Sequence, residues 1–128
     1  MNKLIIDAAR DKIFLTFIVG VNIYTCSHEN SKINFEKLMI LINEFLKNNK
    51  NSLDEVDIIY VNRGPGSFAG IRNSLTTVKA LFLTKKIDYY CFSFDDFKES
   101  ETTKYADVPH LCKKYKIKKN LINPIYLS

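Results

Sequence analysis

The sequence contains no long hydrophobic run and only three cysteines in 128 residues. A transmembrane helix needs about 18 or more consecutive apolar residues, so we expect no membrane-spanning segment. The first residues lack the charged start, apolar core and cleavage site of a secretory leader. Cys26, Cys91 and Cys112 are odd in number and widely spaced, which argues against a disulfide framework and for free thiols in a reducing compartment. We therefore expect a cytoplasmic protein.

The motifs of several enzyme classes are also missing. There is no His-Glu-x-x-His sequence, which a zinc protease would need, and the glycine spacing fits neither a P-loop nor a dinucleotide fingerprint. Cys26 and His28, with His110 and Cys112, supply four potential zinc ligands. Their spacing is not that of a known zinc finger, and no cysteine has an obvious histidine partner for nucleophilic catalysis. We expect no metal, no catalytic residue and no autonomous enzyme.

The most informative stretch spans residues 63–72 and holds three of the four glycines. It joins an apolar run, residues 56–61, to a helix-like segment that starts near Phe68. Glycine allows positive φ angles and close approach of the backbone. Gly66 and Ser67 would present bare amides near a helix N-terminus, where anions and carbonyls are favoured. From the glycine pattern alone, a tight strand-to-helix turn and an anion-binding loop both remain open.

This stretch resembles the GPGSFTG(I/V/L)R signature of the TsaB (YeaZ) family, with Ala69 in the place of the usual Thr. The matching loop residues are Gly64, Pro65, Gly66, Ser67, Phe68, Gly70 and Arg72. Residues 4–7 resemble the opening ILAIDTS strand of the family, residues 52–57 the segment before the loop, and residues 123–127 the closing PxYLR. The resemblance covers residues 3–98 and the last few residues. TsaB is a subunit of the bacterial machinery that makes threonylcarbamoyladenosine in tRNA.

The order of elements is α/β. We expect strands at residues 3–7, 13–19, 21–26, 56–62 and 89–93, and helices at residues 33–47 and 68–85. The resemblance implies a single ribonuclease-H-like lobe of the actin-like ATPase superfold, with a mixed five-stranded sheet. It also implies a TsaB-like N-terminal lobe at residues 1–97, a short C-terminal remnant at residues 98–128 packed on or extending the same domain, and a second lobe that is mostly absent. Residues 98–106 are polar and predict a loop.

Each expected helix has an apolar stripe for the core and a second face of mixed character. The stripes comprise Phe35, Leu38, Met39, Ile42, Phe45 and Leu46, and then Ile71, Leu75, Val78 and Phe82. The second faces carry Ile33, Lys37, Ile40 and Glu44, and then Thr76, Ala80 and Leu83. Isolated apolar residues on a polar face usually need no explanation. The resemblance, however, implies that this outer face packs against TsaD or against another TsaB copy.

Asp7 ends the first strand, where a carboxylate could reach a phosphate. In actin-like ATPases the matching Asp belongs to a phosphate-binding hairpin, but here Ala8 and Ala9 replace the hydroxyl residues of the family. A vestigial phosphate site and an Asp that caps the following turn both remain open. Arg72 would face the interface or a nucleotide phosphate, or would pair with Asp7 or Glu44. We expect no cofactor in this chain alone, and ATP or ADP only at the interface of a complex.

The formal net charge of +5 is concentrated near the end of the chain. Five lysines lie within seven residues there, namely Lys113, Lys114, Lys116, Lys118 and Lys119. One interpretation is an electrostatic contact with RNA, and the other is a solvated surface strand or a tail that maintains solubility.

Two functions are compatible with these observations. The resemblance implies a non-catalytic subunit that binds and activates a TsaD-like threonylcarbamoyltransferase, with a TsaE-like ATPase and tRNA as further partners in the complex. A homodimer of the chain alone remains open. The alternative is a shortened relative that acts as a basic RNA-binding or self-associating module without a TsaD partner. An exposed outer helix face would favour the first function.

Overall fold

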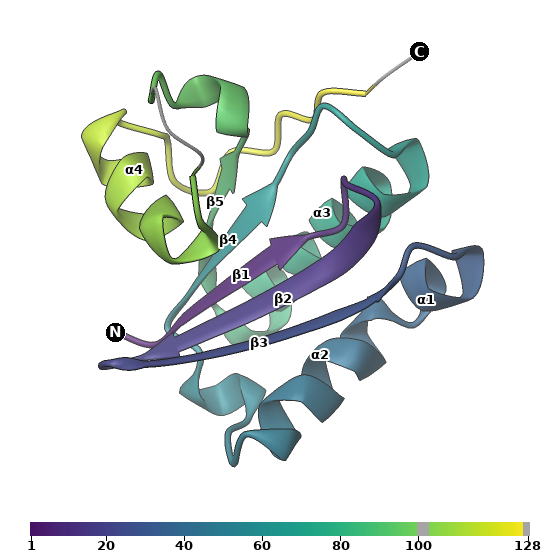
Figure 1. Ribbon diagram of the computed structural model, residues 1–128. Coiled ribbons are helices and arrows are strands. Elements are labelled where there is room, and N and C mark those ends of the chain that lie inside the picture. The colour runs from purple at the N-terminus through teal and green to yellow at the C-terminus, as the bar shows by residue number, and fades with distance from the viewer. Residues whose placement is uncertain (100–102, 127–128) are drawn as a thin grey trace.

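The computed structural model describes residues 1–99 and 103–126 and contains a five-stranded sheet between two layers of helices (Figure 1). The strands are β1 (Lys3–Asp7), β2 (Lys12–Val19), β3 (Asn22–Glu29), β4 (Ile58–Asn62) and β5 (Asp88–Phe92). The helices are α1 (Lys32–Glu36), α2 (Leu38–Asn48), α3 (Phe68–Lys85) and α4 (Val108–Lys114). Three short 3-10 turns are η1 (Leu53–Glu55), η2 (Phe94–Asp96) and η3 (Tyr105–Asp107).

The sheet is mixed, with the strand order β3-β2-β1-β4-β5. β1 pairs with β2 and β2 with β3 in antiparallel register, whereas β4 pairs with both β1 and β5 in parallel register. The carboxyl ends of β1, β4 and β5 therefore meet at one edge of the sheet. Polar residues that follow these strands are brought together there, as at the ligand-binding edge of many open sheets.

The two faces of the sheet bury different cores because side chains alternate along each strand. In β1, Leu4 and Ile6 face the layer formed by α1, α2 and α3, while Ile5 faces α4 (Figure 1). We call the cluster on the α4 side the second core; it comprises Ile5, Ile58, Tyr60, Phe92, Phe97, Val108, Leu111 and Cys112. All five residues of β4 are buried.

The α/β class and the mixed five-stranded sheet are confirmed, and β1 and α3 have the predicted bounds. β3 extends three residues beyond the predicted end, because its whole length pairs with β2 across the hairpin. β4 begins at Ile58 rather than at residue 56, because η1 and the extended Val56 lead into the strand.

The prediction of one helix over residues 33–47 is wrong. At Lys37 the backbone leaves helical geometry, with φ −105° and ψ 26°, and this residue caps both α1 and α2. The apolar periodicity runs through the break, and neither glycine nor proline marks it. The pattern alone therefore could not reveal two helices.

The segment after β5 packs against the same sheet. α4, which the sequence analysis did not anticipate, places Val108, Leu111 and Cys112 in the second core. Beyond α4 the described chain, to residue 126, forms the isolated bridges Tyr90–Lys119 and Gly66–Tyr126 with the rest of the fold. Among the described residues, no helix is long and apolar enough to cross a membrane.

Candidate functional site

The glycine-rich loop links the end of β4 to the start of α3, at the sheet edge where β1 and β5 also end. Its conformation is fixed by local hydrogen bonds. Ser67 caps α3, its Oγ accepting a 3.2 Å bond from the Gly70 amide. The Oδ1 atom of Asn62 accepts a 2.9 Å bond from the Gly64 amide. Gly64 has φ 109°, a conformation that favours glycine.

Two further glycines permit close packing against the β1–β2 turn. A Cβ atom at Gly66 would overlap the carbonyl oxygen of Ala9, and one at Gly70 would overlap that of Ala8. The Ser67 amide donates a 3.0 Å hydrogen bond to the Ala9 carbonyl. Of the two expected partners for this amide, an anion and a carbonyl, the structure has the carbonyl, because the β1–β2 turn occupies the position that an anion would take.

The end of the described chain covers the other side of the loop. The amide of Ile125 donates a 2.7 Å hydrogen bond to the carbonyl of Arg63. Tyr126 pairs with Gly66 in a parallel bridge, and its ring lies 4.7 Å from the ring of Phe68. The closing motif at residues 123–126 thus packs on the glycine loop, while Leu127 lies outside the described residues.

Asp7 is fully buried and engaged by its own chain. Its carboxylate accepts a 2.6 Å hydrogen bond from the Tyr105 hydroxyl and a 3.1 Å bond from the Ala9 amide. Burial raises the pKa of Asp7, and the bonds from Tyr105, Ala9 and Asn62 offset part of that increase. The bond from Ala9 to Oδ1 has the geometry of the turn-capping alternative, and the Tyr105 hydroxyl occupies the second oxygen, Oδ2.

A cleft of about 420 Å³ lies at the same sheet edge, and Asp7 is not among the residues that line it. Its lining includes Arg10, Asn62, Gly64 and Ser93. Arg10 donates a 3.4 Å hydrogen bond to the Tyr105 hydroxyl, which itself donates to Asp7. The positively charged guanidinium group of Arg10 therefore lies beside the Tyr105 hydroxyl, which in turn binds the Asp7 carboxylate.

The predicted outer face of the helical layer is exposed. Ile33, Ile40 and Leu83 leave 70%, 54% and 61% of their surface accessible. The polar and small members of the face, Lys37, Glu44, Thr76 and Ala80, are exposed as well. Since α1 and α2 both contact α3, these side chains lie on neighbouring helices.

A shallow groove of about 610 Å³ runs along α3 between this face and the end of the described chain. Thr76, Ala80 and Leu83 line one side of the groove. Ile122, Pro124 and Tyr126 line the other side and are themselves exposed. The groove is mostly apolar and open to solvent, so it can accept side chains from another molecule.

Arg72 lies at one end of this groove and is exposed. Within residues 1–99 and 103–126, no carboxylate lies within 4.0 Å of its guanidinium group. The alternative in which Arg72 pairs with Asp7 or Glu44 is therefore wrong. Arg72 lies on the outer side of α3. The alternatives in which it faces a partner interface or a nucleotide phosphate stay predictions.

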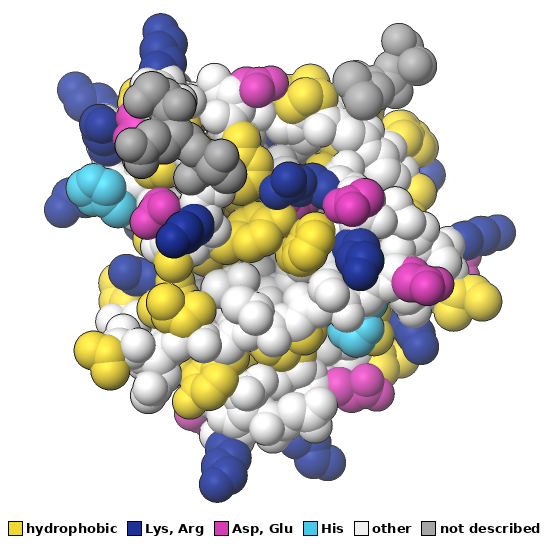
Figure 2. Space-filling view, in the orientation of Figure 1, with side chains coloured by type: hydrophobic (Ala, Val, Ile, Leu, Met, Phe, Trp, Pro, Cys, Tyr) yellow, Lys and Arg dark blue, Asp and Glu magenta, His cyan; other side chains and the backbone are white. Residues whose placement is uncertain are grey.

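The lysine-rich segment is not a surface strand. Lys113 and Lys114 end α4, and Lys116 follows with a left-handed φ of 54°. Lys114 forms an ion pair with Glu99 at 3.2 Å, and Lys119 forms one with Asp88 at 3.5 Å. Lys and Arg side chains project around α4, at the upper left of Figure 2.

The cysteines show no activated thiol. Burial raises the pKa of Cys26 to about 11 and those of Cys91 and Cys112 to about 12. His28 lies 3.8 Å from Cys26 on β3, whereas His110 belongs to α4 on the other side of the sheet. In the described part of the chain, no three His, Cys, Asp or Glu side chains are grouped so as to hold a metal ion.

Three features of this region were not predicted from the sequence. Tyr105 closes the Asp7 site, and the Arg63–Asp96 ion pair, at 2.7 Å, joins the end of β4 to η2. Tyr126 contributes to the groove beside α3. The spacing of Val108 to Leu111 and Cys112, three and four residues, could have predicted α4, but nothing local to Tyr105 points to Asp7.

Comparisons with known proteins agree with this geometry. The family model described as TsaD, tRNA N6-adenosine threonylcarbamoyltransferase, matches residues 28–93, about half of the chain. The tRNA threonylcarbamoyladenosine biosynthesis protein TsaB of Buchnera aphidicola subsp. Baizongia pistaciae is 35% identical over 83 residues, covering 56% of this chain and 38% of that protein. TsaB of Buchnera aphidicola subsp. Schizaphis graminum is 30% identical over 90 residues, covering 70% and 43%.

A solved structure supports the fold. YeaZ from Pseudomonas aeruginosa superposes with a TM-score of 0.66 at 20% identity, over 72% of this chain and 43% of that chain. The chain spans less than half of the length of these relatives. Because the family model, the two TsaB relatives and the fold all agree, the chain belongs to the TsaB (YeaZ) family of tRNA threonylcarbamoyladenosine biosynthesis proteins.

Proposed function

We propose that this chain is a non-catalytic subunit that binds and activates a TsaD-like threonylcarbamoyltransferase. The observation that carries the proposal is the exposed outer face of α1, α2 and α3. Ile33, Ile40 and Leu83 project from a layer whose other large apolar side chains are mostly buried. Burial of such side chains against a partner stabilises a complex by about 25 cal/mol per Å² of apolar surface, before the cost of association.

The glycine loop would support this role indirectly. Gly66 and Gly70 hold the start of α3 against the β1–β2 turn, and Ser67 caps the helix. The loop therefore fixes how the outer side of α3 is presented. Since α3 also forms one wall of the apolar groove, a partner helix or loop could contact α3 and the closing segment together.

The environments of Asp7 and of the three cysteines favour an accessory role over catalysis. Asp7 is covered by Tyr105, and the three thiols have pKa values raised by burial. A catalytic carboxylate or thiolate must reach its substrate. In the complex, ATP or ADP would bind at the interface, a TsaE-like ATPase would dock nearby, and tRNA would be held mainly by the catalytic subunit. Free cysteines suit this role in the reducing cytoplasm.

The test is threonylcarbamoyl transfer to tRNA by the TsaD-like protein of the same organism, with the other pathway enzymes supplied. Transfer should require this chain, and the two proteins should co-elute from a sizing column. Leu83→Asp and Ile33→Asp should each weaken the complex by about tenfold or more, because a charge in a desolvated contact is costly. The matched control is Val21→Asp, which places the same charge on a side chain that is 95% exposed in the β2–β3 turn.

Three results would contradict the proposal. Transfer that proceeds equally well without this chain would remove the activating role. Equal losses in Leu83→Asp and Val21→Asp would show that the added charge, and not the outer face, matters. A chain that only self-associates through α3, without binding the transferase, would support the self-associating alternative instead.

A further inference from the structure

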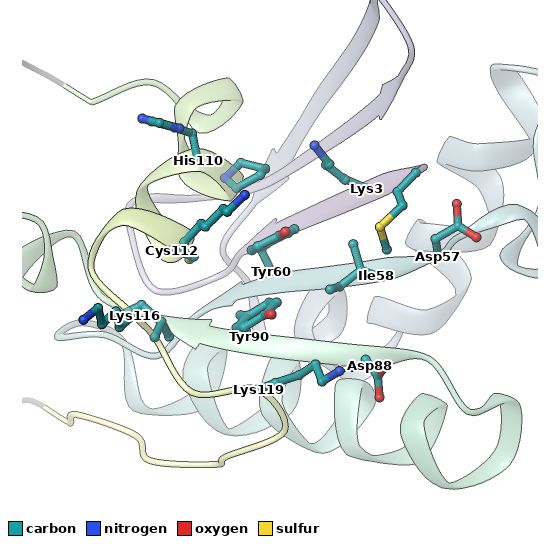
Figure 3. A pocket seen from close by; sticks show the side chains of 14 residues that line it. Lys3, Asp57, Ile58, Tyr60, Asp88, Tyr90, His110, Cys112, Lys116 and Lys119 are labelled. Carbon is teal, nitrogen blue, oxygen red and sulfur yellow. Dashed lines mark ion pairs between the residues drawn. The ribbon is translucent and has the colours of Figure 1, made fainter.

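A second concave site lies on the opposite side of the sheet from the proposed interface. It is a pocket of about 780 Å³ formed by β1, β4 and β5 on one side and by α4 with the turn after it on the other (Figure 3). The volume is within the range of small-ligand sites, about 300–1,000 Å³. Because α1, α2 and α3 cover the other face of the sheet, a partner bound there would leave this pocket open (Figure 1).

Two tyrosine rings form the middle of the pocket. Tyr60 of β4 and Tyr90 of β5 are direct neighbours in the parallel register. Their rings are nearly parallel, with centroids 5.3 Å apart and an angle of 15° between the planes. Ile58 and Ile117 extend this apolar floor. Tyr60 is buried, with 6% of its surface accessible, whereas Tyr90 is half-buried, so Tyr90 is the ring that a ligand can reach. Accessible aromatic rings stack against nucleobases, whatever the base.

The rim of the pocket is basic. Lys3, Lys113, Lys116 and Lys119 all line it. Figure 3 shows Lys3 on one side of the tyrosine pair and Lys119 on the other, while the amine of Lys116 points away from the rings. The lysines therefore surround the aromatic floor instead of converging on one point.

The two acidic residues of the pocket are already engaged. Asp57 accepts a 2.6 Å hydrogen bond from the Asn2 amide. Asp88 pairs with Lys119 at 3.5 Å and accepts a bond from Asn120 at 2.9 Å. Within the part of the chain that the structure describes, the amines of Lys3 and Lys113 have no carboxylate within 4.0 Å. These two amines are available to an anion.

The arrangement differs from a site for a free nucleotide. Compact phosphate sites use backbone amides from glycine-rich turns or helix N-termini. None of the four glycines lines this pocket, and it is the C-terminal end of α4 that carries Lys113. Amines that lie apart from one another around an aromatic floor instead suit the phosphates of a nucleic-acid strand, which are spaced along its backbone.

We propose that the tyrosine–lysine pocket between α4 and the β4–β5 edge binds single-stranded RNA. An unpaired base stacks on Tyr90, and Lys3 and Lys113 contact phosphates of the backbone. The choice of RNA over DNA rests on the proposed function in tRNA modification, but the site itself does not depend on the transferase. Of the five lysines in the basic cluster, Lys114 and Lys118 do not line this pocket, so they take no part in the contact.

The test is fluorescence anisotropy with a fluorescein-labelled oligouridine RNA of about ten nucleotides, a length suited to a single binding groove. Binding should weaken as salt rises, with a log–log slope of about −1.4 if two phosphates are neutralised. The double variant Lys3→Ala/Lys113→Ala should lose most of this slope. Its matched control is Lys12→Ala/Lys47→Ala, which removes two exposed lysines that do not line the pocket.

Stacking is tested at Tyr90. Tyr90→Leu keeps an apolar side chain in the second core but removes the ring, and should weaken binding by about fivefold or more. Tyr90→Phe keeps the ring and should bind as the unmodified chain does. Circular dichroism of both variants would establish that each is folded.

The proposal is overturned if the RNA fails to bind at low salt, or if both lysine double variants bind equally well. It is also overturned if duplex RNA or free ATP at the same nucleotide concentration competes as effectively as the single strand. The proposed function is tested separately, because Leu83→Asp should impair the transferase complex and leave RNA binding by this chain unchanged.

Discussion

The hydroxyl of Tyr105 donates a 2.6 Å hydrogen bond to the buried carboxylate of Asp7, across 98 positions of the sequence. Tyr105 belongs to η3, and Asp7 is the last residue of β1. The bond therefore joins the segment after β5 to the sheet edge where the glycine loop also lies. In this way the chain itself covers a carboxylate that could otherwise face a phosphate.

The first prediction concerns the pH dependence of Asp7. Burial raises the pKa of Asp7 above its ordinary value of 3.8, so the folded state retains this proton to higher pH than the unfolded chain does. The stabilising contribution of protonated Asp7 is present below pH 3.8 and is lost as the pH rises through the folded pKa. Asp7→Asn removes this titration, so the variant should gain stability relative to the unmodified chain as the pH rises. Urea unfolding of both proteins from pH 3.5 to pH 8 measures the difference, and a difference that falls with pH would contradict the assigned direction.

The second prediction concerns the close approach at Gly70. A Cβ atom there would overlap the Ala8 carbonyl oxygen and press on the Phe35 ring. Gly70→Ala should therefore cost about 3 kcal/mol in the free energy of unfolding. The control is Gly20→Ala, where the added atom meets open space and only the left-handed φ of 59° is unfavourable, at a cost of about 1 kcal/mol. If the two substitutions cost the same free energy of unfolding, the close contact of Gly70 with Ala8 would not be the reason that glycine is needed at position 70.

The sequence predicted the framework of the fold well, because local chemistry specifies it. The apolar run at residues 3–7 predicted β1, and the segment that starts near Phe68 predicted α3, both with the observed bounds. The same reasoning identified the exposed outer residues Ile33 and Leu83, since helical periodicity separates them from the core stripe.

The remaining features depend on contacts between distant segments. Nothing near Tyr105 in the sequence indicates that its hydroxyl meets Asp7. The sequence left an anion and a carbonyl open as partners of the Ser67 amide, because the position of the Ala9 carbonyl is set by tertiary packing. The break at Lys37 likewise carries no local helix-breaking residue.

The third prediction concerns a buried hydroxyl. Tyr89 is fully buried, and its Oη atom has no hydrogen-bond partner among the described residues. A buried polar group without a partner costs about 1–3 kcal/mol. Tyr89→Phe removes the hydroxyl and keeps the ring contact with Phe82, so the variant should be more stable by about 1 kcal/mol. Thermal unfolding provides the measurement, and a clear loss of stability would mean that this hydroxyl is hydrogen-bonded in solution.

The fourth prediction concerns the ion pair between Arg63 and Asp96, whose side chains are only 15% and 21% exposed. Arg63 also donates a 3.1 Å hydrogen bond to the carbonyl of Asn123 and so ties the closing segment to β4. Arg63→Met should cost about 2 kcal/mol, because it leaves a partly buried carboxylate without its charged partner.

The matched control for Arg63→Met is Lys85→Met, which breaks the Lys85–Asp54 pair on the surface. Since the side chain of Asp54 is 83% exposed, that loss should stay within about 0.5 kcal/mol. Urea unfolding of both variants distinguishes the two pairs. The double variant Arg63→Met/Asp96→Asn should recover part of the loss, because the unpaired charge is then gone. If it recovers nothing, the cost of Arg63→Met comes from the lost contact with Asn123, and the closing segment rather than the ion pair is what Arg63 stabilises.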